Sequence, residues 1–118
     1  MTTEEQFRER TKNFALAVLR AVENVPGSLA GNVLVKQLIR SATSVGANYR
    51  AACHARSKPD FIAKLSIAQE ECDESVYWIE LLGAMNILNT DESLSLRNEG
   101  REITAMLTSS IKTARSHP

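Results

Sequence analysis

Residues 57–82 read SKPDFIAKLSIAQEECDESVYWIELL, and this stretch decides the fold that the sequence predicts. Pro59 follows Ser57 by two positions, and proline is well tolerated in a first helical turn. Apolar residues then recur at steps of three, four or seven positions, at Leu65, Ala68, Cys72, Ile79 and Leu82. This period is typical of a long helix that buries one apolar stripe.

Two further breaks divide the rest of the chain, at residues 25–28 (VPGS) and 89–92 (NTDE). In the second break we expect Thr90 to be the N-cap, with two acids favourably placed behind it in the first turn. The breaks leave four helical segments, at about residues 3–24, 29–56, 59–88 and 91–115. The other three segments carry apolar stripes of their own: Phe7, Phe14, Val18, Ala21 and Val25; Leu34, Leu38, Val45, Tyr49 and Ala52; Leu96, Ile103, Leu107 and Ala114.

The short connections force neighbouring helices to run antiparallel. The sequence therefore predicts an all-α protein, with residues 1–118 forming one antiparallel up-down-up-down four-helix bundle. A chain of 118 residues with 43% hydrophobic and 24% charged residues suits a single soluble domain. No apolar run is long enough to span a membrane, and the polar N-terminus has no signal core. The two cysteines, Cys53 and Cys72, are too far apart along their helices for a disulfide and suit a reducing cytoplasm.

The C-terminal half of the third segment has more apolar surface than one stripe. Its second apolar face holds Trp78, Leu81, Met85 and Leu88. A helix that is apolar all round is normally buried all round, yet each helix of a small bundle has an outer face. We therefore predict that these four residues form the interface of a homo-oligomer. The alternative is that loops or the N-terminal residues cover this face.

Charge is sorted between the second and third segments. Residues 29–58 hold five basic residues and no acid, whereas residues 59–88 hold six acids and one lysine. A basic strip on the polar side of the second helix would contain Lys36, Arg40, Arg50, His54 and Lys58. The strip could follow a nucleic-acid phosphate backbone, or its charges could pair with acidic neighbours. The formal net charge of zero favours pairing.

A polar group interrupts the second helix, where Ser44 and Asn48 lie one turn apart. We expect these two residues to form a hydrogen-bonded contact between helices with Glu71; the alternative is simple exposure to solvent. The sequence offers only two histidines, no Glu-x-x-His pair and no glycine-rich phosphate loop. It therefore predicts no catalytic residue, no metal site and no cofactor. Three glycines fall inside helices, where close helix approach is the expected reason: Gly46, Gly83 and Gly100.

A family resemblance is found in two stretches of the chain. They are residues 37–50 (QLIRSATSVGANYR) and residues 57–68, the second running on to Glu71, Glu74 and residues 77–82. The chain resembles the bacterial four-helix-bundle proteins related to those encoded in intervening sequences of large-subunit ribosomal RNA genes, also called S23 ribosomal protein-like. The resemblance implies a four-helix bundle, often assembled as a homopentamer, with no known catalysis.

Some members of that family are accessory proteins of retroelements and bind nucleic acid and a reverse transcriptase. Those members are markedly basic, whereas this chain is neutral and has Ala51-Ala52 where many members have Glu-Gly. The leading expectation is therefore a non-enzymatic, self-assembling scaffold or adaptor. The alternative is a nucleic-acid-associated accessory protein that uses the basic strip of the second helix.

Overall fold

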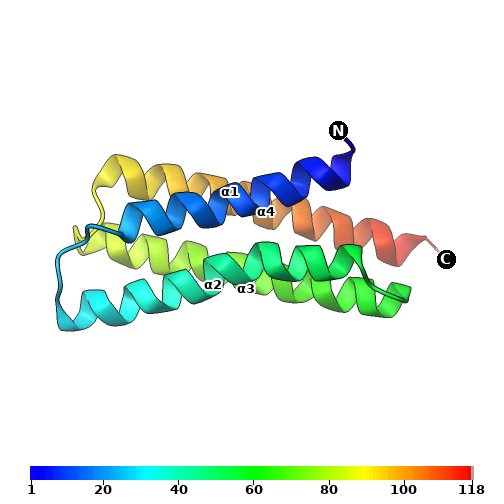
Figure 1. The fold of residues 1–118 in the computed structure, drawn as a ribbon, viewed down its shortest axis with the longest axis horizontal. Coiled ribbons are helices and arrows are strands. Elements are labelled where there is room, and N and C mark those ends of the chain that lie inside the picture. The colour runs from blue at the N-terminus through cyan, green and yellow to red at the C-terminus, as the bar shows by residue number, and fades with distance from the viewer. Residues whose placement is uncertain (118) are drawn as a thin grey trace.

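The structure, a computed structural model, describes residues 1–117. It contains four α-helices: α1 (Thr3–Val22), α2 (Leu29–Cys53), α3 (Lys58–Ala84) and α4 (Thr90–Ser116). Each helix runs antiparallel to the one before it, so both termini lie at the same end of an elongated bundle (Figure 1), which measures 49 × 25 × 19 Å. The predicted up-down-up-down arrangement is confirmed.

Each helix begins at a polar residue whose side chain accepts a backbone N–H of the first turn. Thr2 and Glu5 form a reciprocal capping box at α1, Ser28 accepts from Gly31, and Ser57 accepts from Asp60. At α4 the cap is Asn89, whose Oδ1 accepts the Glu92 N–H at 2.7 Å. The prediction of Thr90 as the cap is wrong by one position, because the Asn89 amide oxygen occupies that role.

Helix α3 ends four residues before the predicted position. Asn86 has a φ of 57°, the left-handed conformation that asparagine tolerates better than most residues, and this turns the chain out of the helix. The N–H groups of Ile87 and Leu88 then both lie within hydrogen-bonding distance of the Leu82 carbonyl oxygen, at 2.9 and 3.2 Å. The turn carries Leu88 into the core, where it is 2% exposed.

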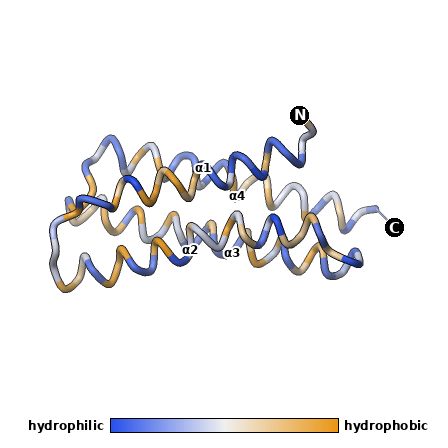
Figure 2. Tube along the Cα trace, in the orientation of Figure 1, coloured by the Kyte–Doolittle hydropathy of each residue, from blue (hydrophilic) through white to orange (hydrophobic). Residues whose placement is uncertain are grey.

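The predicted apolar stripes meet along the bundle axis, and Figure 2 shows hydrophobic and hydrophilic residues alternating along every helix. The largest fully buried side chains include Phe14, Leu38, Leu65, Ile79 and Leu107. Helix α3 packs most extensively, against α2 and α4, whereas α1 packs less closely against α2 and least against α4.

The helical glycines mark close approaches, as predicted. A Cβ at Gly100 would lie 2.7 Å from Val76 Cγ2, and one at Gly83 would lie 2.7 Å from Ser93 Oγ. A Cβ at Gly46 would meet Thr11 Oγ1 less tightly, at 3.3 Å. None of the helices described is long and apolar enough to cross a membrane.

Candidate functional site

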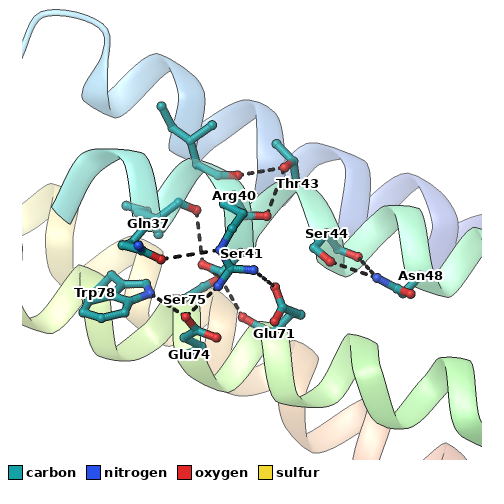
Figure 3. A network of polar contacts seen from close by, with 12 residues as sticks. Gln37, Arg40, Ser41, Thr43, Ser44, Asn48, Glu71, Glu74, Ser75 and Trp78 are labelled. Carbon is teal, nitrogen blue, oxygen red and sulfur yellow. Dashed lines mark hydrogen bonds and ion pairs between the residues drawn. The ribbon is translucent and has the colours of Figure 1, made fainter. Parts of the chain in front are cut away.

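A polar network joins the outer edges of α2 and α3 (Figure 3). Arg40 spans two acids of α3: its Nη1 lies 2.8 Å from Glu71 Oε2 and its Nη2 lies 2.7 Å from Glu74 Oε1. The hydrogen bond to Glu74, and then the charge of Glu71, raise the pKa of Arg40. Glu74 also accepts the indole N–H of Trp78 at 3.2 Å. The network therefore fixes the position of Trp78 as well as the register of the two helices.

Beneath this network lies a buried hydroxyl pair. The hydroxyls of Ser41 and Ser75 are hydrogen-bonded at 2.8 Å, and both residues are 0% exposed. Each also reaches a carbonyl oxygen of its own helix, at Leu38 and Glu71. This buried contact discriminates against a slipped register, because a slip would remove the hydrogen bond between the helices and leave each hydroxyl only the carbonyl oxygen of its own helix.

The predicted contact among Ser44, Asn48 and Glu71 does not form. Asn48 Nδ2 donates within its own helix, to the carbonyl oxygen and hydroxyl of Ser44 at 2.9 and 2.8 Å. Glu71 instead pairs with Arg40, because a carboxylate binds a guanidinium more strongly than a neutral amide. The polar contact that α2 makes with α3 lies one turn earlier, at Arg40 and Ser41, and the prediction did not name these residues as its members.

The predicted interface residues divide into three groups. Trp78 and Leu81 are partly buried, and Met85 is 51% exposed. Leu88 is a wrong prediction, because the turn after α3 places it in the core of its own chain. The prediction assumed that the helix continued to residue 88.

Two exposed side chains of α2 extend this surface. Leu29 is 87% exposed and Val33 is 54% exposed. Because Ser41 lies opposite Ser75 and the helices are antiparallel, Val33, eight residues before Ser41, lies level with the last turn of α3. We call Leu29, Val33, Trp78, Leu81 and Met85 the apolar end of the α2–α3 face.

The predicted basic strip is only partly available for a ligand. Arg40 is bound to Glu71 and Glu74, as the pairing alternative predicted. The remaining members of the strip are exposed and have no ion pair within residues 1–117: Lys36, Arg50, His54 and Lys58. Lys58 begins α3 and does not extend α2. Charge pairing between α2 and α3 is therefore made by Arg40 alone in the part of the chain described.

The two thiols are both free and both protonated at neutral pH. Burial raises the pKa of Cys72 to about 11, and its Sγ lies 3.2 Å from the Gly100 carbonyl oxygen. Burial, together with the nearby Glu4, also raises the pKa of Cys53 to about 11. Reactive cysteines have the opposite shift, so neither thiol is an activated nucleophile. Across residues 1–117, histidine, cysteine and acidic side chains do not gather in groups of three or more that could hold a metal ion.

Comparison with known proteins gives a family match and matches to solved structures. Residues 4–109 match the family described as 23S rRNA-intervening sequence protein. The fold matches the crystal structure of a protein of unknown function from the S23 ribosomal protein family of Bacteroides thetaiotaomicron VPI-5482, with a TM-score of 0.86. The two sequences are 34% identical, and the match covers 94% of this chain and 99% of the other. No curated protein matches significantly.

Proposed function

The chain belongs to the 23S rRNA-intervening sequence protein family, and from that premise we propose that it is a non-enzymatic scaffold that assembles with copies of itself through the apolar end of the α2–α3 face. The observation that carries this proposal is the exposed apolar surface that two neighbouring helices build at one end of the bundle. Leu29, Val33 and Met85 are each more than half exposed there. Such contiguous surface is characteristic of protein interaction sites.

Two properties of this surface, a side chain that is already held in place and its residue composition, suit a protein interface. Trp78 is held by its bond to Glu74, which Arg40 holds in turn. A side chain that is already fixed loses little rotamer freedom on association, so its burial contributes more to binding. Tryptophan, methionine and aliphatic side chains with a polar rim match the composition of interface cores. Arg40, Glu71 and Glu74 would form that rim.

The proposed assembly is a homopentamer, which is the state that the family resemblance implies. The chain mass is 13.0 kDa, so a closed ring of five copies would have five times this mass. A closed ring of five copies is built from head-to-tail contacts, so it requires two different, complementary surfaces on each copy. The apolar end would be one of them.

The test measures mass by light scattering after size exclusion. Val33→Glu and Met85→Glu each place a charge in the apolar end, and the double variant should convert the oligomer into a folded monomer. Ile67→Glu is the matched control, because Ile67 is 40% exposed on α3 but lies eighteen residues, about 27 Å along the helix, before Met85. Circular dichroism checks that all three proteins remain helical. A wild-type protein that is monomeric at high micromolar concentration, or a double variant that keeps the wild-type mass, would contradict the proposal.

A second candidate function is nucleic-acid binding by the basic strip. The observation that favours it is that Lys36, Arg50 and Lys58 are exposed and carry no ion pair within residues 1–117. Contacts of this kind release counterions, so the affinity should fall steeply with salt. Gel shifts with an oligonucleotide across a salt series test it. Binding that does not change with salt, or no binding at low salt, would exclude the strip as the binding surface.

A further inference from the structure

Helix α2 has a second flank, facing α1, and this flank is open. A groove with a volume of about 350 Å³ runs between the two helices, which is within the range of small-molecule sites. We call it the α1–α2 groove. Its lining residues are Arg8, Glu9, Thr11, Lys12 and Ala15 from α1, and Thr43, Gly46, Ala47 and Arg50 from α2.

The groove is bordered by cations that the fold leaves without partners. Arg8, Lys12 and Arg50 line it, and within residues 1–117 none of them forms an ion pair. Glu9 is the one acid in the lining, so the groove has a formal charge of +2. Of the other arginines, three form ion pairs: Arg10 with Glu99, Arg40 with Glu71 and Glu74, and Arg101 with Glu80.

Small side chains in the lining keep the groove open. Ala15 comes from α1, and Gly46 and Ala47 come from α2. A larger side chain at position 46 would meet the backbone of Thr11, since even a Cβ there would lie 3.6 Å from the Thr11 carbonyl carbon. The Thr43 hydroxyl donates to the Ile39 carbonyl oxygen at 2.8 Å, so its hydrogen is not free for a ligand. Recognition in this groove therefore depends on the three cations.

We propose that the α1–α2 groove is a binding site for a phosphate-bearing ligand, held by Arg8 and Arg50 with Lys12 beside them. Arginine presents a planar fork that matches two phosphate oxygens, and lysine adds a point charge. The groove has no aromatic lining residue, so the ligand is recognised through its phosphates and not through a stacked base.

This site shares Arg50 with the basic strip but differs from it in its other residues. Arg8 and Lys12 belong to α1 and contribute nothing to a strip along α2, whereas Lys36 and Lys58 belong to the strip and do not line the groove. The site also does not depend on self-assembly, because it lies on the opposite flank of α2 from α3. Failure of the scaffold proposal and failure of this one are therefore separate results.

The experiment uses the full chain and two probes, inorganic tripolyphosphate and a twelve-nucleotide oligothymidylate, with binding followed by calorimetry and fluorescence anisotropy. The double variant Arg8→Gln/Arg50→Gln removes two groove charges. The matched control Lys36→Gln/Arg56→Gln removes two exposed charges outside the groove. Ala47→Phe fills the groove without changing charge. We expect the two groove variants to weaken binding by at least about tenfold and the control to weaken it by less than about threefold.

The outcomes distinguish the source of the phosphate. Groove-dependent binding of tripolyphosphate supports the proposal with a small phosphorylated molecule as the ligand. Groove-dependent binding of the oligonucleotide alone supports it with a nucleic-acid backbone as the ligand. The proposal is overturned if neither probe binds, if the groove and control charge variants lose affinity equally, or if Ala47→Phe binds as well as the wild type.

Discussion

Helices α3 and α1 belong to the same bundle but are held in it by different means. Helix α3 has buried contacts on both flanks: the hydroxyls of Ser41 and Ser75 meet between it and α2, and Gly100 allows Val76 to approach α4. Helix α1 packs less extensively against its neighbours and has grooves on both flanks, whereas α3 is bordered by grooves, one of about 380 Å³, on its α4 side. The α1–α2 groove lies on one side of α1, and a groove of about 390 Å³ bordered by α1 and α4 lies on the other.

This difference between the two flanks of α2 shows how a chain with no net charge can present two different interaction surfaces. Where Arg40 meets Glu71 and Glu74, between α2 and α3, these charges are paired, and the surface beside them at the end of the bundle is apolar. Where α1 meets α2, three cations remain without partners, and the surface left for interaction is positive. The formal net charge of zero is therefore compatible with two chemically distinct faces of helix α2, an apolar one beside α3 and a positive one beside α1.

The largest expected effect is on local opening. Since α1 packs least, amides at residues 3–10 should exchange through openings that cost at least about 3 kcal/mol less than global unfolding, which itself costs about 5–15 kcal/mol. Amides at residues 65–79 of α3 should exchange only through global unfolding. Native-state hydrogen exchange with added denaturant measures both sets. Equal protection of the two sets would show that the two helices are held equally firmly.

A smaller effect is expected from adding a methyl group to two helical glycines. Gly100→Ala should destabilise the fold by about 1–3 kcal/mol, because its Cβ would lie 2.7 Å from the buried Val76 and force a shift. Gly46→Ala should be neutral or stabilising by up to about 1 kcal/mol, because alanine favours a helix and the contact with Thr11 is looser. Urea unfolding measures both variants. If Gly46→Ala is as damaging as Gly100→Ala, the α1 side is packed as tightly as the α3 side.

The sequence predicted the bundle well because helix period, breaks and caps are local signals. It failed where the outcome depended on one conformation or on a neighbouring helix. The apolar run continues through Leu88, and the prediction gave no weight to Asn86, a residue type that commonly ends helices in the left-handed conformation it adopts here. The helical period could have predicted that Ser75 is buried, because it lies three residues after Cys72 and four before Ile79. The prediction missed it because only apolar residue types were considered.

The groove was harder to predict than the interface. Arg8 and Lys12 lie in a segment whose acidic and basic residues balance. The net charge of that helix therefore gave no indication that these two cations form part of a positive groove. Their significance depends on which residues of α2 lie beside them, and this follows from helix packing and not from the local sequence. The same reason explains the misplaced Glu71 contact, because the partner of Glu71 was set by the register between α2 and α3.

The buried hydroxyl pair should contribute less than the glycine contact. Ser41→Ala and Ser75→Ala should each destabilise the fold, and a double-mutant cycle should give a coupling energy of about 1 kcal/mol, as is usual for one buried hydrogen bond. Thr43→Ala combined with Ser75→Ala is the control cycle, since Thr43 donates within its own helix. Its coupling should be close to zero. A Ser41–Ser75 coupling no larger than the control would mean that packing alone holds α2 against α3.

The smallest expected effect belongs to the charges that link α1 to α4. Arg10 makes a two-point contact with Glu99, at 2.9 and 2.8 Å, but both side chains remain about a third exposed. Exposure to water and salt limits such a pair, so Arg10→Met, which keeps the apolar stem, should cost less than about 1 kcal/mol. Arg20→Met is the control, because Arg20 is exposed on the same helix without an ion pair in residues 1–117.

The salt dependence of this effect decides what holds α1 to α4. At about 1 M salt the screening length falls to about 3 Å, and the difference between the Arg10 and Arg20 variants should disappear. Urea unfolding at low and high salt measures this difference. If the cost of Arg10→Met persists at high salt, the guanidinium also acts through its hydrogen bond to Met106, whose sulfur accepts from Arg10 Nη1 at 3.1 Å. Helix α1 would then be held on its α4 flank by a hydrogen bond that salt does not weaken, even though a groove borders that flank as well.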